Sequence, residues 1–140
     1  MTITSSEILD LAKGEIARVA ASAYTEDGIS MYDAIRPVSR DGAQLKTYYD
    51  EALAYMNARL KVRAVSGEQV MLPFADSIAS ETDITPLANT FMVSYICAEW
   101  FRRKYPVKNE EYAAKATASL EQLVILAKTR KQPTKGGITL

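Results

Sequence analysis

The chain has 140 residues, 48% of them hydrophobic, and its 17 basic and 17 acidic residues give a formal charge of zero. This length and composition predict one folded domain and exclude an intrinsically disordered chain. Zero net charge provides no overall field that would attract nucleic acid or an anionic membrane, so any such binding would have to be local.

No stretch approaches the ~20 apolar residues of a membrane span, and residues 1–10 lack the pattern of a secretion signal. We therefore expect a soluble protein that is not secreted and has no membrane partner. The single cysteine, Cys97, lies in an apolar helical pattern. This favours a buried core residue over a catalytic or redox thiol.

The hydrophobic pattern predicts an all-α fold, a four-helix bundle. The first helix should begin at Thr4 or Ser5, because Thr4 and Glu7 have the spacing of a capping box. Asp27-Gly28 marks the turn region after it, and a long connection follows. The apolar residues of this helix recur every three or four positions and form one face: Ile8, Ala12, Ile16, Val19 and Ala23.

The second predicted helix, residues 43–62, is the most clearly amphipathic segment of the chain. Between residues 63 and 82 the helical pattern breaks. Residues 62–65 (VRAV) and 69–72 (QVML) flank residues 66–68 (SGE), which is compatible with a short hairpin or a loop. The apolar stripe of the helix comprises Leu45, Tyr49, Ala52, Leu53, Met56 and Leu60.

The third helix is predicted over residues 86–104, with Asp83 or Thr85 as the N-cap and Pro86 at the first helical position. It is apolar over most of its circumference, so we expect it at the centre of the domain. Pro106 should end this region, and Asn109 is predicted to cap a fourth helix over residues 110–130. The apolar stripe of that helix comprises Tyr112, Ala116, Leu120, Leu123 and Ala127.

The C-terminal region is the candidate partner-binding surface. Residues 123–126 (LVIL) are apolar on every side, which indicates either a second buried surface against a partner or a fold that covers both faces. Beyond a helical domain of residues 1–132, residues 133–140 are predicted to be an extended tail. The candidate contacts to a partner or subunit are Leu123, Ile125, Leu126, Lys128, Arg130, Lys131, Ile138 and Leu140.

Three basic clusters follow the last three helices. Cations are favoured at helix C-termini, which explains their positions without a function. Alternatively, the clusters converge on one surface that faces DNA, another subunit or an acidic partner. The sequence leaves both interpretations open. The clusters are Arg59, Lys61 and Arg63; Arg102, Arg103 and Lys104; and Lys128, Arg130, Lys131 and Lys135.

The residues that commonly carry catalysis are missing. The chain has no histidine, which removes the commonest general base and the usual zinc ligand. Three acidic pairs, Glu26-Asp27, Asp50-Glu51 and Glu110-Glu111, are more simply explained by solvation or capping, because adjacent helical residues do not face one point. We predict no enzymatic activity, no cofactor and no metal.

Two segments carry a family resemblance. Residues 41–53 read DGAQLKTYYDEAL, an acidic cap followed by a helix with an EAL core. Residues 83–87 read DITPL and open an aromatic helix that breaks at Tyr105-Pro106, after which residues 111–116 read EYAAKA. These segments resemble the head–tail connector (adaptor) proteins of tailed bacteriophages, a helical family; the second is similar to the family's last two helices.

The resemblance implies a structural virion protein of the neck region, synthesised in the host cytoplasm. Such a protein would form a homo-oligomeric ring of about a dozen copies and dock on the portal protein through residues 123–140. It would offer a platform to the next neck or tail protein and let DNA pass through its lumen without sequence-specific binding. The alternatives are a small helical DNA-binding or DNA-packaging protein, with Arg102 to Lys104 near the duplex, and a carboxylate or metal-dependent enzyme.

Overall fold

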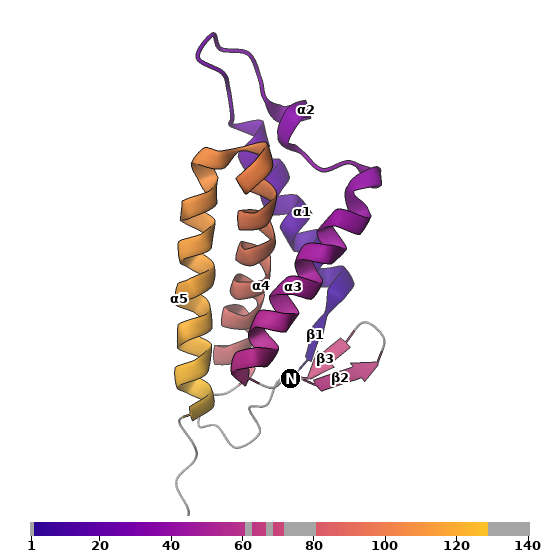
Figure 1. Ribbon diagram of the computed structural model, residues 1–140, viewed down its shortest axis with the longest axis vertical. Helices are drawn as coiled ribbons and strands as arrows, with labels where there is room; N and C mark the ends of the chain where they lie inside the picture. Colours follow the sequence, from indigo (N-terminus) through magenta and orange to yellow (C-terminus); the bar gives the residue numbers. More distant parts are fainter. Residues whose placement is uncertain (1, 61–62, 67–68, 72–80, 129–140) are drawn as a thin grey trace, which may run out of the picture.

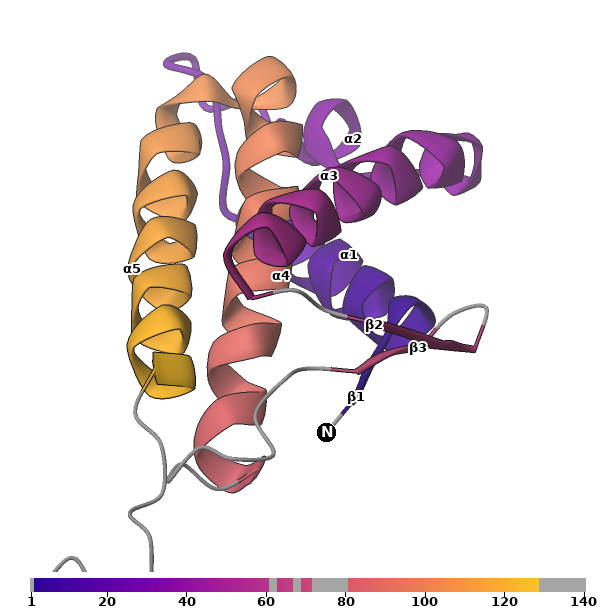
Figure 2. The same ribbon diagram turned by 60° about the horizontal axis from the view of Figure 1, so that its bottom comes forward.

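The computed structural model describes residues 2–60, 63–66, 69–71 and 81–128. Four long helices dominate it, which confirms the predicted all-α four-helix bundle. They are α1 (Ser5–Ala21), α3 (Gly42–Leu60), α4 (Glu81–Lys104) and α5 (Asn109–Lys128). In Figure 2, α4 lies between α5 on one side and α1 and α3 on the other.

The apolar faces predicted for the helices form the core. All five residues of the α1 stripe are buried, and in α3 the predicted stripe is buried except for Leu53, which is half-buried. Tyr48 joins that buried face. In α4, buried side chains point in several directions because α1, α3 and α5 all pack against it. The predicted central position of this helix is therefore confirmed.

Helix α4 begins at Glu81, five residues before the predicted start, so the prediction that Pro86 occupies the first helical position was wrong. One feature favours the earlier start: Ile84, which the additional turn includes, is buried in the core. Proline in the second turn costs one backbone hydrogen bond, which the packing of the longer helix offsets.

The predicted caps differ from expectation. Asp83 and Thr85 lie inside α4, so the prediction that one of them is its N-cap was wrong. Thr4 is the N-cap of α1, as its sequence position indicated, but its side chain makes no capping hydrogen bond. Asn109 is the first residue of α5, and its side-chain amide donates to the carbonyl of Ala98 in α4 at 2.8 Å. The Asn109 side chain therefore ties the two helices together instead of capping its own.

A small sheet covers the end of the bundle where the chain begins. The hairpin that the sequence left open is present: β2 (Arg63–Ser66) and β3 (Gln69–Met71) pair antiparallel with an irregular register between Ala64 and Ser66. The sequence did not predict β1 (Thr2–Thr4), which pairs with the other edge of β3 and gives the strand order β1-β3-β2. Ile3 of β1 is buried in the core, which anchors the sheet to the helices.

The connection between α1 and α3 contains an unpredicted short helix, α2 (Tyr32–Ile35), and a 3-10 turn, η1 (Ser39–Asp41). Trp100 of α4 holds α2 in place, because its indole nitrogen donates to the carbonyl of Ile35 at 2.7 Å. A second 3-10 turn, η2 (Pro106–Lys108), joins α4 to α5. In Figure 1, the loop of residues 22–31 and the α4–α5 connection lie at the same end of the bundle.

Candidate functional site

The residues predicted to form the C-terminal contact surface differ in their exposure. Leu123 is fully buried in the core, so assigning it to a partner contact was wrong; the bundle itself uses this side chain. Val124 is also buried and Leu126 packs partly against the core, whereas Ile125 is 57% exposed. The fold therefore covers most of the apolar segment 123–126 and leaves Ile125 at the surface.

The remaining predicted contacts fall at or after the end of α5. Lys128 is the last residue of that helix, but its side chain lies outside the described residues. Arg130, Lys131, Ile138 and Leu140 also lie outside the described residues. For these five positions the sequence-based prediction stays a prediction.

Helix directions decide whether the three basic clusters meet. Figure 1 shows that α3 and α5 end in the half of the molecule where α4 begins, while α4 ends in the opposite half. The basic residues at the end of α4 are therefore separated from Arg59 near the end of α3 and from the C-terminal end of α5. Among the described residues, the cluster at the end of α4 therefore does not share a surface with Arg59.

Arg102, Arg103 and Lys104 are all exposed at the end of α4. Arg102 forms a 2.8 Å ion pair with Glu99 one turn earlier, and the Lys104 ammonium lies 5.7 Å from the ring centroid of Trp100. These contacts fix two of the three cations along their own helix. Charge at a helix C-terminus thus accounts for much of this cluster.

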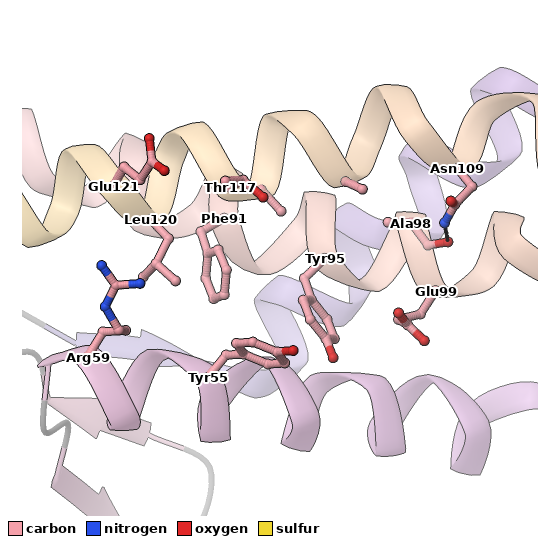
Figure 3. A pocket seen from close by; sticks show the side chains of 12 residues that line it. Tyr55, Arg59, Phe91, Tyr95, Ala98, Glu99, Asn109, Thr117, Leu120 and Glu121 are labelled. Carbon is pink, nitrogen blue, oxygen red and sulfur yellow. Dashed lines mark hydrogen bonds between the residues drawn. The ribbon is translucent and has the colours of Figure 1, made fainter.

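A groove of about 270 Å³ lies between α3, α4 and α5 (Figure 3). Aromatic rings from two helices line its middle. The ring centroids of Tyr55 and Tyr95 are 5.4 Å apart, and those of Phe91 and Tyr95 are 6.1 Å apart. Tyr55 is 59% exposed although it takes part in this cluster, so the groove presents aromatic surface to solvent.

Small residues on α5 explain why the groove is open. Ala113, Ala116 and Thr117 line the groove, and their short side chains do not fill the space between α3 and α5. Leu120 adds an apolar contact near one end of the groove. The result is a channel with an apolar middle along the side of the bundle.

Polar groups flank the aromatic middle. The Tyr95 hydroxyl donates to Glu51 at 3.3 Å, and burial followed by the Glu51 charge raises the pKa of Tyr95 above its usual 10. In Figure 3, Arg59 and Glu121 lie toward one end of the groove and Glu99 toward the other. The charged lining residues are thus two carboxylates and one guanidinium, with the Glu51 carboxylate beside them.

A second polar cluster joins α1 to α5. Tyr112 donates a hydrogen bond to Glu15, which also pairs with Arg18. The hydrogen bond from Arg18 is the largest influence that lowers the pKa of Glu15, with Tyr112 contributing in the same direction. This arrangement favours the ionised form of Glu15 and links α1 to α5.

The acidic pairs considered for catalysis remain apart. Glu26 and Asp27 lie exposed in the 22–31 loop, and Asp50 pairs with Lys46 on its own helix at 2.7 Å. Glu111 pairs with Lys108 at 3.2 Å, at the start of α5. Within the described part of the chain, no group of three or more potential metal ligands gathers at one point.

Sequence reasoning did not identify the groove. Tyr55 lies outside the predicted apolar stripe of α3. An aromatic residue beside such a stripe was the one feature of the sequence that could have indicated the groove. Only the packed helices show that α3 stands away from α5 at this level and leaves space beside the short side chains of α5.

Comparisons with known protein families, curated proteins and solved structures found no match for this chain. In the described residues, no helix is both long and apolar enough to cross a membrane.

Proposed function

We propose that this protein is a head–tail connector of a tailed bacteriophage, a non-catalytic structural protein that assembles as a ring between the portal and the tail or neck. Its subunits would number about a dozen, with DNA passing through the lumen. The proposal starts from the resemblance of residues 41–53 and 83–116 to adaptor proteins. In the structure these segments contribute to α3, α4 and α5 of the bundle.

The observation that best supports this role is the difference between the two ends of the bundle. At one end, the 22–31 loop exposes Tyr24 and Ile29, and Val107 in η2 is 73% exposed. At the other end, α5 leads into residues 129–140. A connector must bind two different neighbours at once, which requires two different surfaces far apart on one rigid subunit.

The loop end is ordered enough to act as a docking surface. The amide of Thr25 donates to the carbonyl of Ile29 at 2.8 Å, and Gly28 closes the turn with its amide bonded to Thr25 at 2.9 Å. Tyr24 and Ser30 form an isolated antiparallel bridge at the base of the loop. The exposed apolar side chains are therefore presented on a defined backbone, and this end would receive the next neck or tail protein.

The first test is the mass of the purified protein in solution, alone and mixed with the candidate portal protein, for the full chain and for a chain ending at Gln132. A ring, or a monomer that binds portal only when residues 133–140 are present, is the expected result. A monomer that ignores portal in both forms would contradict the connector proposal.

The alternative is a small DNA-binding protein that uses the exposed cluster Arg102, Arg103 and Lys104. The zero net charge disfavours it, because non-specific DNA binders are typically basic. Duplex DNA affinity measured at rising salt decides between the two. Affinity that falls steeply with salt and is lost in Arg103→Glu would favour DNA binding, since phosphate contacts release counterions.

A further inference from the structure

The groove between α3, α4 and α5 has the chemistry of a peptide-binding site. Its middle is aromatic, with Tyr55 half-open to solvent, and carboxylates outnumber cations around it. Aromatic faces bind aliphatic side chains by excluding water, and nearby carboxylates favour cations. The fitting occupant is a segment with one or two aliphatic side chains, several basic residues and no acidic ones.

Residues 129–140 of this chain have that composition. They read TRKQPTKGGITL, with three basic residues, no acidic residue, and Ile138 and Leu140 as the aliphatic side chains. Pro133 and Gly136-Gly137 provide positions at which the chain can change direction.

The segment also starts close enough to reach the groove. Glu121 lines the groove seven residues before the end of α5 at Lys128, a distance of roughly 10 Å along the helix. The ten residues from Lys128 to Ile138 can span up to ~33 Å when extended. A chain that reverses after α5 therefore has ample length to place Ile138 beside the aromatic rings.

Because residues 129–140 are covalently attached to α5, binding of the groove by the same chain is favoured over binding by another copy. A short flexible connection gives an effective concentration in the millimolar range. When the protein is at micromolar concentration, this effective concentration exceeds that of the same segment on other copies by about a thousandfold.

We propose that the groove lined by Tyr55, Phe91 and Tyr95 is the docking site for residues 129–140 of the same chain. Ile138 or Leu140 covers the rings, and the basic residues face Glu121 and Glu51. The groove is then an intramolecular receptor that holds the C-terminal segment until another binding partner competes for it. This inference does not depend on the connector role, because it concerns the isolated protein.

The test uses the full-length protein with Ile138→p-benzoylphenylalanine, a photo-crosslinking residue, at micromolar concentration. Irradiation should give a product of monomer mass, and peptide mapping should place the crosslink on the groove residues of α3, α4 or α5. Crosslinks that join two copies, crosslinks on other surfaces, or none at all would overturn the proposal.

Matched variants check the chemistry in the same crosslinking protein. Tyr55→Ala should reduce the groove crosslink about fivefold, the equivalent of one lost aromatic contact, whereas Tyr24→Ala, at an equally exposed tyrosine outside the groove, should leave it unchanged. Glu121→Lys should reduce it as well, while Glu110→Lys on the exposed first turn of α5 should not. Equal yields in Tyr55→Ala and Tyr24→Ala would overturn the assigned site.

A portal-binding measurement is independent of this crosslink. If the crosslink maps to the groove and portal is ignored, the docking inference stands and the connector proposal fails. If the protein binds portal but the crosslink does not map to the groove, the connector proposal stands and the docking inference fails.

Discussion

The contribution of a side chain to this bundle depends on the groups that lie next to it in the fold. Trp100 illustrates this, because the indole is buried against the core while its N–H reaches the Ile35 carbonyl of a different element. A buried donor without that acceptor would cost roughly 1–3 kcal/mol. The hydrogen bond thus explains how a single-turn helix such as α2 is kept in place.

Glu15 gives a pH-dependent contribution to stability. Its folded-state pKa is lowered from the ordinary 4.5, chiefly by the Arg18 hydrogen bond, so its contribution is present above about 4.5 and lost as the pH falls through the lower folded value. We expect Glu15→Gln to lower the free energy of unfolding by about 1 kcal/mol at neutral pH, with the difference from the parent disappearing in acid. Urea denaturation across the acidic range measures this.

Asp10 provides the control, since it is exposed on the same helix beyond the first turn. Asp10→Asn should change the free energy of unfolding little. A parent–Glu15→Gln difference that persists unchanged below the folded pKa would contradict the assignment of the charge effect to Glu15.

Cys97 should behave as a buried structural residue. Its side chain is fully buried, and burial raises the pKa of the thiol to about 12, so almost no thiolate exists at neutral pH. We expect no reaction with a disulfide-forming thiol reagent in the native protein and full reaction after denaturation. Rapid labelling under native conditions would show that α4 opens readily at this position.

At the scale of elements, the sequence predicted the helices well and their ends less well. The stripe on α1 follows from helical periodicity, which records burial directly. The start of α4 and the partner of Asn109 depend on which helix lies opposite, and local sequence signals for caps did not contain that information.

Replacing each of two glycines with alanine should change the stability of the protein in opposite directions. Gly14 lies inside α1, and an added Cβ would meet nothing within 4 Å, so Gly14→Ala should stabilise the protein by about 1 kcal/mol through helix propensity. Gly28 has a φ of +80° in the 22–31 loop, so Gly28→Ala should destabilise by roughly 1 kcal/mol. Thermal unfolding of both variants measures the pair.

A destabilising Gly14→Ala would show that α1 needs this glycine for a contact beyond the described residues. A neutral Gly28→Ala would show that the loop backbone relaxes without cost, which would weaken its proposed use as an ordered docking surface.

At the scale of the whole molecule, one core joins all four long helices. Buried residues from α1, α3, α4 and α5 form a single cluster, and Ile3 of β1 extends it to the sheet. A single cooperative unit of this size should unfold in one transition.

This cooperativity is measurable with the single tryptophan. Trp100 fluorescence reports the α2–α4 junction, and far-UV circular dichroism reports all the helices. We expect the two signals to give the same denaturation midpoint. An earlier fluorescence transition would mean that the α1–α3 connection opens before the bundle.

The sequence by itself determined the four helices, their buried faces and the burial of Cys97, because periodicity and composition are local records of what each helix covers. Only the packed helices show that Arg102, Arg103 and Lys104 lie at the end of the bundle opposite Arg59, that Leu123 belongs to the core, and that an open groove is lined by Tyr55, Phe91 and Tyr95. Those features depend on helix direction and on the distance between helices, which arise from packing among segments far apart in the chain.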